Sequence, residues 1–214
     1  MPGRLQLCVL LVLACGMQLP GQAAGSAAHT QLAYRNDVQG VRAAISQGAH
    51  VDATDARGHT CLLHAARWGH AALAEELLRE HGATVDVKET INGNAALNYA
   101  AHEGHLAIAK VLLEHGADHR LVDDDGWTPL MSAAARGHLD MVKMLLSLSQ
   151  VGDNAETHTG NTRDWQNHDG TTPLMAAIAN SHTDVANMLL DAGADVNRRK
   201  LSGANAVMIA SREG

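Results

Sequence analysis

Histidine is the residue type in this sequence best suited to chemistry, because an imidazole can bind a metal ion or transfer a proton near neutral pH. The chain has 14 histidines. The segment His102-Glu103-Gly104-His105 comes nearest to a zinc motif. Its two histidines are not placed one turn apart on an uninterrupted helix, as a helical zinc site requires. We therefore expect no metal ion and no other cofactor.

Two further groups have residue types that occur in catalytic or metal sites. Cys61 stands where we expect a helix to begin, a position that can stabilise a thiolate, but no general base accompanies it. We interpret it as a small apolar residue. The run from Asp123 to Asp125 lacks the alternating oxygen ligands of a calcium loop, which favours a solvated turn. Because no phosphate-binding glycine loop or nucleophile elbow occurs either, the sequence predicts that the protein is not an enzyme.

Three sequence markers recur along the chain with one period. The first is a glycine in a polar turn, at Gly58, Gly93, Gly126, Gly170 and Gly203. The second is a small residue followed by histidine, at Gly69-His70, Gly104-His105, Gly137-His138 and Ser181-His182. The third is a leucine pair, at Leu77-Leu78, Leu112-Leu113, Leu145-Leu146 and Leu189-Leu190. Their shared register indicates an array of repeats, one of which carries an insertion.

Each repeat is predicted to form two helices. In one unit Thr128 stands at the N-cap and Pro129 at the first helical position, where the missing N–H costs nothing. Gly137 then ends the first helix, and the pair at Leu145 lies on the apolar face of the second. The chain has no phenylalanine, and its many alanines and leucines favour closely packed helices over a β-sandwich.

These units resemble ankyrin repeats. The segments from Asp125 to His138 and from Asp169 to His182 carry most of the family pattern Gly-x-Thr-Pro-Leu-x-x-Ala-Ala-x-x-Gly-His. The resemblance implies an all-α solenoid of stacked helix–turn–helix units with β-hairpin or turn fingers. It also implies that each histidine of a Gly-His pair bonds the backbone of the neighbouring turn. The family's histidine after Pro-Leu is replaced, so we expect apolar contacts there at most of Leu63, Asn98, Met131, Met175 and Met208.

The markers divide the chain into units. We predict a signal peptide over 1–23, a degenerate first unit over 30–54, full repeats over 55–88, 89–122, 123–166 and 167–200, and a truncated half repeat over 201–214. The third full repeat contains an inserted polar loop at about 147–163. The half repeat has no second helix after Val207, Met208 and Ile209, so we expect an uncovered apolar face there.

The N-terminal segment predicts export. The apolar run from Leu5 to Ala14 is too short to span a bilayer, follows Arg4 and precedes a stretch of small residues. That order is typical of a signal peptide, cleaved after Ala23 or slightly later, which would send the protein to the periplasm or the medium. The alternative is a bacterial lipobox, in which an acylated Cys15 would anchor the protein to a membrane as a lipoprotein.

The charge pattern limits the kind of partner. The net charge is −7, with acidic and basic residues scattered along the chain. A nucleic-acid surface needs clustered Lys and Arg, so we expect no nucleic acid, and the sequence predicts no membrane span. The resemblance implies a protein partner instead, which would dock on the concave face formed by the fingers and first helices.

The predicted contacts on that face include two tryptophans as anchors, because exposed Trp and Arg often dominate binding. The full set is His59, Arg67, Trp68, Asn94, His102, Glu103, Trp127, Arg136 and Thr171. The function expected is therefore a non-catalytic, exported scaffold that binds a protein. The alternative is a lipid-anchored or periplasmic helper that supports or protects an enzyme of the cell envelope.

Overall fold

The structure, a computed structural model, describes residues 26–149 and 162–213. Within these ranges it contains helices and turns but no strand. The first helices of successive units are α2 (Ser26–Tyr34), α4 (Cys61–Trp68), α6 (Ala96–Glu103), α8 (Pro129–Arg136), α10 (Pro173–Ala179) and α12 (Ala206–Glu213). The second helices are α3 (Val38–Ser46), α5 (Ala71–Arg79), α7 (Leu106–Glu114), α9 (Leu139–Ser149) and α11 (Thr183–Asp191). A short 3₁₀ helix, η1 (Thr162–Asp164), precedes α10.

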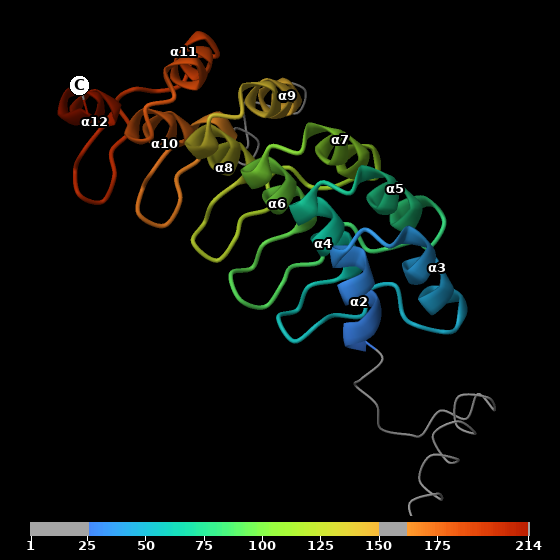
Figure 1. Cartoon of the computed structure of the whole chain (residues 1–214). Helices are drawn as coiled ribbons and strands as arrows, with labels where there is room; N and C mark the ends of the chain where they lie inside the picture. Colours follow the sequence, from blue (N-terminus) through green and yellow to red (C-terminus); the bar gives the residue numbers. More distant parts are fainter. Residues whose placement is uncertain (1–25, 150–161, 214) are drawn as a thin grey trace, which may run out of the picture.

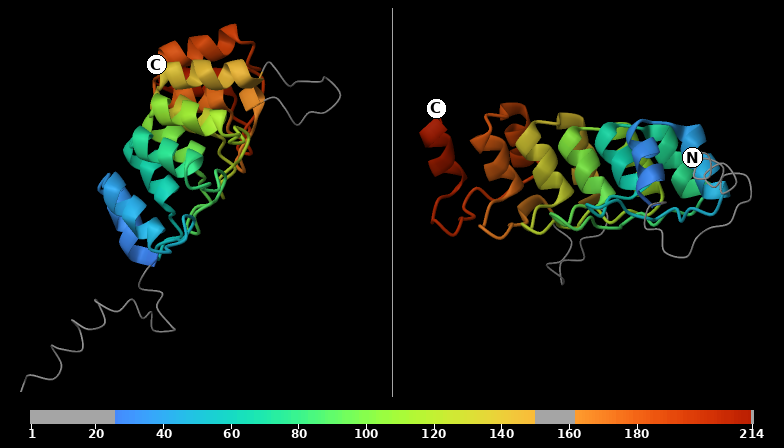
Figure 2. Two further views of the ribbon diagram at one scale, coloured as in Figure 1. Left: turned by 90° about the vertical axis from the view of Figure 1, so that its right-hand side faces the viewer. Right: turned by 60° about the horizontal axis from the view of Figure 1, so that its bottom comes forward.

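The helices form two stacked rows, with the first helices in one row and the second helices in the other (Figure 1). Each first helix packs against the first helix of the next unit, from α2 through to α12. The fingers, which are the loops that lead into the first helices, extend from the row of first helices along one side of the molecule (Figures 1 and 2). The prediction of an all-α solenoid of helix–turn–helix units is confirmed.

Caps fix where the first helices begin. The hydroxyl of Thr128 accepts the backbone N–H of Met131 at 3.2 Å, and Pro129 follows as the first residue of α8. Thr60 and Thr172 cap α4 and α10 in the same way. Such a cap stabilises a helix by about 1 kcal/mol, because it pairs an N–H that the helix leaves free.

The helix α6 lacks a threonine cap and uses a different contact. Here Ala95 stands at the cap, and its N–H donates to Oδ1 of Asn98 at 3.2 Å. The amide of Asn98 also donates to the carbonyl of Leu121 at 3.2 Å, which ties α6 to the following unit. At the equivalent positions Leu63, Met131 and Met175 are buried, so the predicted apolar substitution is confirmed for these three.

The Gly-His pairs join each unit to the one before it. Gly104 ends α6 with φ of 77°, and a Cβ at this position would lie 2.7 Å from the ring of His138 in the next unit. Nε2 of His138 donates to the carbonyl of His102 at 3.0 Å. His70, His105 and His182 donate to backbone carbonyls of the preceding units in the same manner, which confirms their predicted structural role.

The core consists of small and branched aliphatic side chains. Three first helices carry a fully buried pair of alanines, at Ala65-Ala66, Ala100-Ala101 and Ala133-Ala134. These small side chains allow neighbouring first helices to approach closely. Leu77, Leu112, Leu145 and Leu189, the first leucine of each pair, are buried between the two rows. No helix in the two described ranges has both the length and the apolar character needed to cross a membrane.

Two predicted boundaries differ from the structure, and other predictions fall outside the described ranges. The helix α2 begins at Ser26, before the start at residue 30 that the sequence indicated, so the first unit has a complete helix pair. The helix α9 continues to Ser149, so the insertion begins later than residue 147. Residues 150–161, the predicted signal peptide and Cys15 all lie outside the described residues.

Candidate functional site

A groove of about 550 Å³ crosses the fingers and the first helices in the middle of the array. It spans three units, because its walls come from α6, α8, the end of α10 and the fingers before α6 and α8. Its lining residues are Asn92, Asn94, Tyr99, His102, Asp123, Asp125, Trp127, Ser132, Ala135, Arg136 and Asn180. Four of the predicted contacts, Asn94, His102, Trp127 and Arg136, therefore lie together in one hollow.

A chain of polar contacts joins α6 and α8 at the groove. Nε of Arg136 donates to Nε2 of His102 at 3.1 Å, so that nitrogen is an acceptor. The proton of the ring is then on Nδ1, which donates to the carboxylate of Glu103 at 3.0 Å. Arg136 and Glu103 are exposed. This part of the site therefore presents a cation, an imidazole and an anion to a partner.

The finger before α8 holds Trp127 at the groove. Oδ1 of Asp123 accepts the backbone N–H groups of Asp125 at 3.0 Å and of Trp127 at 2.8 Å. Burial raises the pKa of Asp123, and the nearby carboxylates of Asp125 and Asp124 raise it further. Trp127 is half-buried, so part of its ring supports the finger and part is available to a partner.

A second surface, which we call the aromatic patch, consists of Tyr34, Arg67, Trp68 and Tyr99. Trp68 is 47% exposed and meets the ring of Tyr34 edge-on, with the centroids 5.2 Å apart. The guanidinium of Arg67 lies 5.8 Å from the ring of Trp68 and 5.4 Å from that of Tyr99. Since Tyr99 also lines the groove, the patch adjoins it, although Trp68 and Trp127 do not share one hollow.

Two predicted contacts are buried. His59 is 4% exposed, and its Nε2 lies 3.2 Å from the hydroxyl of Tyr99. Thr171 is 7% exposed, and its hydroxyl donates to Asp169 at 2.6 Å. Asn94 and Trp127 stand at the same position of their units and line the groove, so the inward direction of His59 and Thr171 comes from these side-chain contacts and not from the turn. The structure therefore corrects these two predictions, because both side chains make their contacts inside the fold.

His59 belongs to a cluster with Asp55 and His64 that the sequence analysis did not identify. Partial burial opposes the ionisation of Asp55, but hydrogen bonds from the backbone N–H groups of His59 and Arg57 keep its pKa below the ordinary value. Burial lowers the pKa of His64, against the pull of the Asp55 carboxylate 3.1 Å away. The sequence did contain a signal for this cluster. Among the full repeats, only this one has histidine at both the position of His59 and the position of His64.

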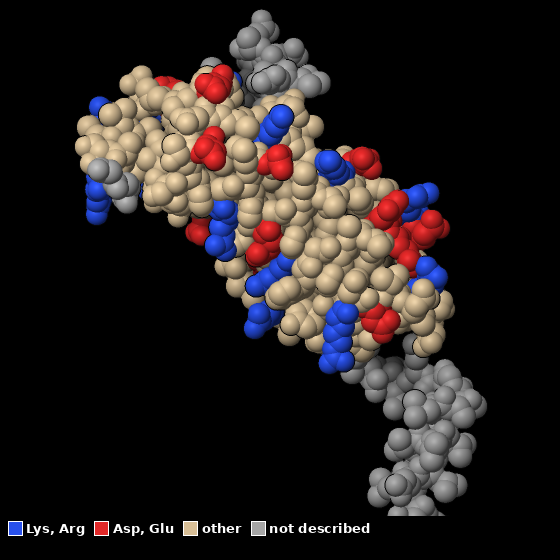
Figure 3. Space-filling view, turned by 45° about the horizontal axis from the view of Figure 1, so that its top comes forward, with Lys and Arg blue, Asp and Glu red and all other residues tan. Residues whose placement is uncertain are grey.

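Tyr34, Tyr99 and Asn180 are surface residues that the sequence analysis also missed. Tyr99 lies four residues after the cap of α6, and Ser132 lies four residues after the cap of α8. Both line the groove, but the residue type at this repeat position differs between the units, so no recurring marker identified it. Charge is mixed on the face in Figure 3, where Lys and Arg lie among Asp and Glu without a single basic patch.

Comparison with known families gives a clear match. The model of the family described as ankyrin repeats (3 copies) matches residues 29–123, 84–159, 116–200 and 154–214, which together include nearly all the residues described. Members of this family typically bind proteins and do not catalyse reactions. The matched ranges extend across both the groove and the aromatic patch.

Several curated proteins are similar over part of their length. A putative ankyrin repeat protein of Fowlpox virus, FPV031, is 31% identical over 134 residues, 60% of this chain and 39% of that protein. The mouse protein fem-1 homolog A-like is 36% identical over 100 residues, 46% of this chain and 14% of its own length. Glycerophosphocholine phosphodiesterase GDE1 of Candida albicans is 41% identical over 92 residues, 43% of this chain and 8% of the enzyme. The chain spans less than half of each of these relatives, and so short a match to the enzyme does not support an enzymatic function.

Proposed function

The chain belongs to the ankyrin-repeat family, and on that premise we propose that it is a non-catalytic scaffold that binds a protein partner across the groove and the adjoining aromatic patch. The single observation that carries this proposal is the groove itself. It brings Tyr99, His102, Trp127 and Arg136 from two successive units into one hollow. Aromatic and arginine side chains are the types that most often dominate a protein interface.

The composition of this surface favours a partner with both apolar and charged groups. Arg67 and Arg136 supply cations, while Asp123 and Asp125 supply carboxylates on the finger. Trp68 is the largest exposed aromatic side chain, at 47%. An exposed ring of this size adds apolar contact area while losing little conformational entropy on binding. A partner segment that inserts an apolar side chain and offers an acid to Arg136 fits these features.

Affinity capture with matched variants tests the proposal. The bait is the full chain as wild type, as Arg136→Ala or as Arg79→Ala. Arg79→Ala is the control, because it removes an exposed arginine from α5, in the row of second helices. We expect the same partner with the wild type and with Arg79→Ala. With Arg136→Ala we expect an affinity lower by about thirtyfold, which corresponds to about 2 kcal/mol. Equal recovery with both arginine variants, each shown to be folded, would contradict the proposal.

We also propose that the protein is exported. The support is the apolar run from Leu5 to Ala14 with small residues after it. N-terminal sequencing of the native protein tests this, and we expect a first residue near Ala24. Mass spectrometry of the same sample distinguishes simple cleavage from acylation at Cys15. A cytosolic chain that still begins at Met1 or Pro2 would contradict export.

A further inference from the structure

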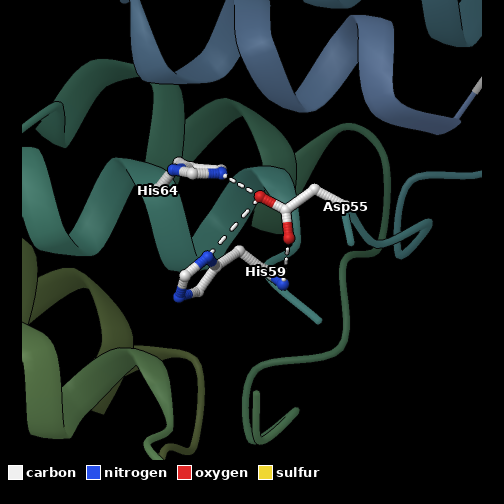
Figure 4. Close-up of side chains that lie close together, drawn as sticks. All are labelled: Asp55, His59 and His64. Atoms are coloured by element: carbon white, nitrogen blue, oxygen red, sulfur yellow. Dashed lines mark hydrogen bonds and ion pairs between the residues drawn. The ribbon is translucent and has the colours of Figure 1, made fainter. Parts of the chain in front are cut away.

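One finger brings together three side chains that commonly bind metal ions. Asp55 and His59 lie at the two ends of the turn before α4, and His64 lies on the first turn of that helix (Figure 4). Oδ2 of Asp55 is 3.1 Å from Nε2 of His64 and 3.5 Å from Nδ1 of His59. One ligand atom from each residue lies within 4.8 Å of the others.

We propose that Asp55, His59 and His64 form a binding site for a divalent transition-metal ion, with Zn²⁺ as the preferred occupant. The ligand atoms are Oδ2 of Asp55, Nδ1 of His59 and Nε2 of His64. In a tetrahedral zinc site with bonds of about 2.0–2.1 Å, neighbouring ligand atoms are about 3.3 Å apart. Two of the separations here are close to that value. Two imidazoles and a carboxylate also suit zinc, with solvent as a fourth ligand.

His59 supplies independent support because one nitrogen of its ring faces the cluster and makes no hydrogen bond. The side chain is 5% exposed, and its Nδ1 is buried without a hydrogen-bond partner. Its Nε2 is paired with the hydroxyl of Tyr99 at 3.2 Å. When Nε2–H donates to Tyr99, the lone pair of Nδ1 faces Oδ2 of Asp55. Two acceptors that face each other in a buried place are costly, and a cation between them satisfies both.

Asp55 is oriented for this role by the backbone. Its Oδ1 accepts the N–H groups of Arg57 at 2.8 Å and of His59 at 2.9 Å. Those two bonds fix the carboxylate plane and direct Oδ2 toward both imidazoles. Tyr99 fixes the ring of His59 in turn. Metal sites commonly hold their ligands through such outer contacts, which set the orientation and tautomer of the ring.

The turn requires an oxygen acceptor at the position of Asp55, which Asn167 supplies in the finger before α10, but it does not require the two imidazoles. In the finger before α8, Asp123 takes the place of Asp55, and its Oδ1 accepts the same pair of backbone N–H groups. There Trp127 and Ser132 stand where the cluster has His59 and His64. The turn is built equally well in both units, so backbone geometry does not explain why one unit carries two histidines.

Metal binding requires one proton to move. In the metal-free protein Nε2 of His64 donates to Oδ2 of Asp55, because a carboxylate oxygen can only accept. Ligation through Nε2 needs the other tautomer or the loss of that proton. A neutral imidazole therefore moves this proton to Nδ1 of His64, whereas an imidazolium, which already carries a proton on Nδ1, releases the Nε2 proton to solvent when the ion enters. No oxidation or reduction occurs in this exchange.

Calorimetric titration of the full chain with Zn²⁺ tests the site. His59→Asn and His64→Ser introduce residues that neighbouring units carry at these positions, as Asn94 and Ser132 show. The control is His168→Gln, which removes an exposed histidine outside the cluster. The wild type and the control should share a tight site and a melting temperature that rises with Zn²⁺.

The variants should lose Zn²⁺ affinity to different extents. Tyr99→Phe removes only an outer contact and should weaken binding by about 10–100-fold. The two ligand variants should lose more than that and should show no thermal shift with Zn²⁺. Wild-type affinity retained in both ligand variants would overturn the proposal.

A second measurement decides the matter if the ligand variants do not fold. One equivalent of Zn²⁺ should shift the ring nitrogen resonances of His59 and His64 in the wild-type chain, and should do so before those of the other histidines. Shifts that leave these two rings unchanged would also overturn the proposal. Neither outcome depends on whether a protein partner binds the groove.

Discussion

Cys61 shows how burial decides the chemistry of a single residue. The thiol is fully buried at the first position of α4, where Pro129 and Pro173 begin α8 and α10. Burial raises its pKa to about 12. The group is therefore a neutral thiol near pH 7, although a helix N-terminus can stabilise a thiolate. The interpretation as a small apolar residue is confirmed, because desolvation outweighs the helix end.

Asp169 provides a test of electrostatics at a single residue. Partial burial opposes its ionisation, but the hydroxyl of Thr171 at 2.6 Å and the ammonium of Lys200 at 2.9 Å lower its pKa from 3.8 to about 2. A lowered folded-state pKa gives stability that is present above about pH 4 and lost as the pH falls toward 2. Asp169→Asn should therefore be less stable than wild type at pH 6. This difference in the free energy of unfolding should shrink to nothing between pH 4 and 2.

Urea unfolding at several pH values measures that gap in the free energy of unfolding. In a Lys200→Met background the gap should be smaller, because one of the groups that lowers the pKa has been removed. A gap that stays constant from pH 6 to pH 2 would show that Asp169 is not held in its charged form by these contacts.

At the level of single residues the sequence predicted roles well where one repeat position recurs. The Gly-His histidines appear in four units, so their shared function could be read from the register. His59 and Thr171 were misplaced because each unit carries a different residue there. Whether such a side chain faces solvent depends on its own hydrogen-bond partners, such as Tyr99 for His59 and Asp169 for Thr171, and the pattern alone does not show those contacts.

Helix ends depend on glycine and on the close fit of the next unit. Gly104 and Gly116 both have positive φ, of 77° and 85°. Alanine at either position costs about 1–2 kcal/mol for the left-handed conformation. At Gly104 the new Cβ also meets the ring of His138, whereas at Gly116 nothing lies within 4 Å. Gly104→Ala should therefore be the more destabilising by about 1 kcal/mol, roughly the value of the displaced hydrogen bond.

Chemical denaturation of the two alanine variants provides the comparison. The shared backbone cost cancels between them, so the difference reports the contact with His138. Equal losses of stability would mean that the ring of His138 moves aside freely and that its bond to the carbonyl of His102 contributes little.

The helix α12 is the least covered element described. Val207 is 61% exposed and Met208 is 53% exposed, as the sequence led us to expect, while Ile209 is partly buried against the core. In the isolated monomer, hydrogen exchange should show the amides of α12 opening before those of α6 and α8, because few buried apolar contacts hold it. Protection in α12 equal to that in α8, in a chain shown to be monomeric, would contradict this.

Element positions were predicted closely, but their ends were not. The markers located the helix pairs because glycine, threonine and proline are required at fixed points of each unit. The helix α9 was predicted to end before Ser147 because a polar insertion follows it. Ser147 instead continues the helix and bonds its hydroxyl to the carbonyl of Met144 at 2.6 Å. Serine can satisfy its side chain locally in this way, so polarity alone did not mark the boundary.

At the scale of the whole molecule, stacking creates the surface that no single unit has. The groove takes its walls from three units, and the aromatic patch joins α2, α4 and α6. The sequence indicated that Arg136 and His102 share a face but not that they touch. That contact depends on the rise and rotation between neighbouring units, which packing of alanines and leucines sets.

The two exposed tryptophans test the proposed surface. Trp68→Ala and Trp127→Ala should each weaken partner binding by about thirtyfold, since anchors of this kind commonly contribute about 2 kcal/mol or more. Affinities and melting temperatures measured together separate binding from stability. Trp68 should change stability less than Trp127, which is half-buried against its finger. Lower melting temperatures with unchanged affinity would identify both as core residues.

The most direct measurement is the footprint of the captured partner on the full chain by hydrogen exchange. We expect the partner to slow exchange in the finger at residues 123–127 and at the ends of α6 and α8. Hydrogen exchange in the second helices α5 and α7 should stay unchanged. The hollow between α3 and α5, lined by Arg42 and Glu76, provides the internal comparison, because it is of similar size but lies on the other row. Protection there, with none at residues 123–127, would contradict the proposed binding surface.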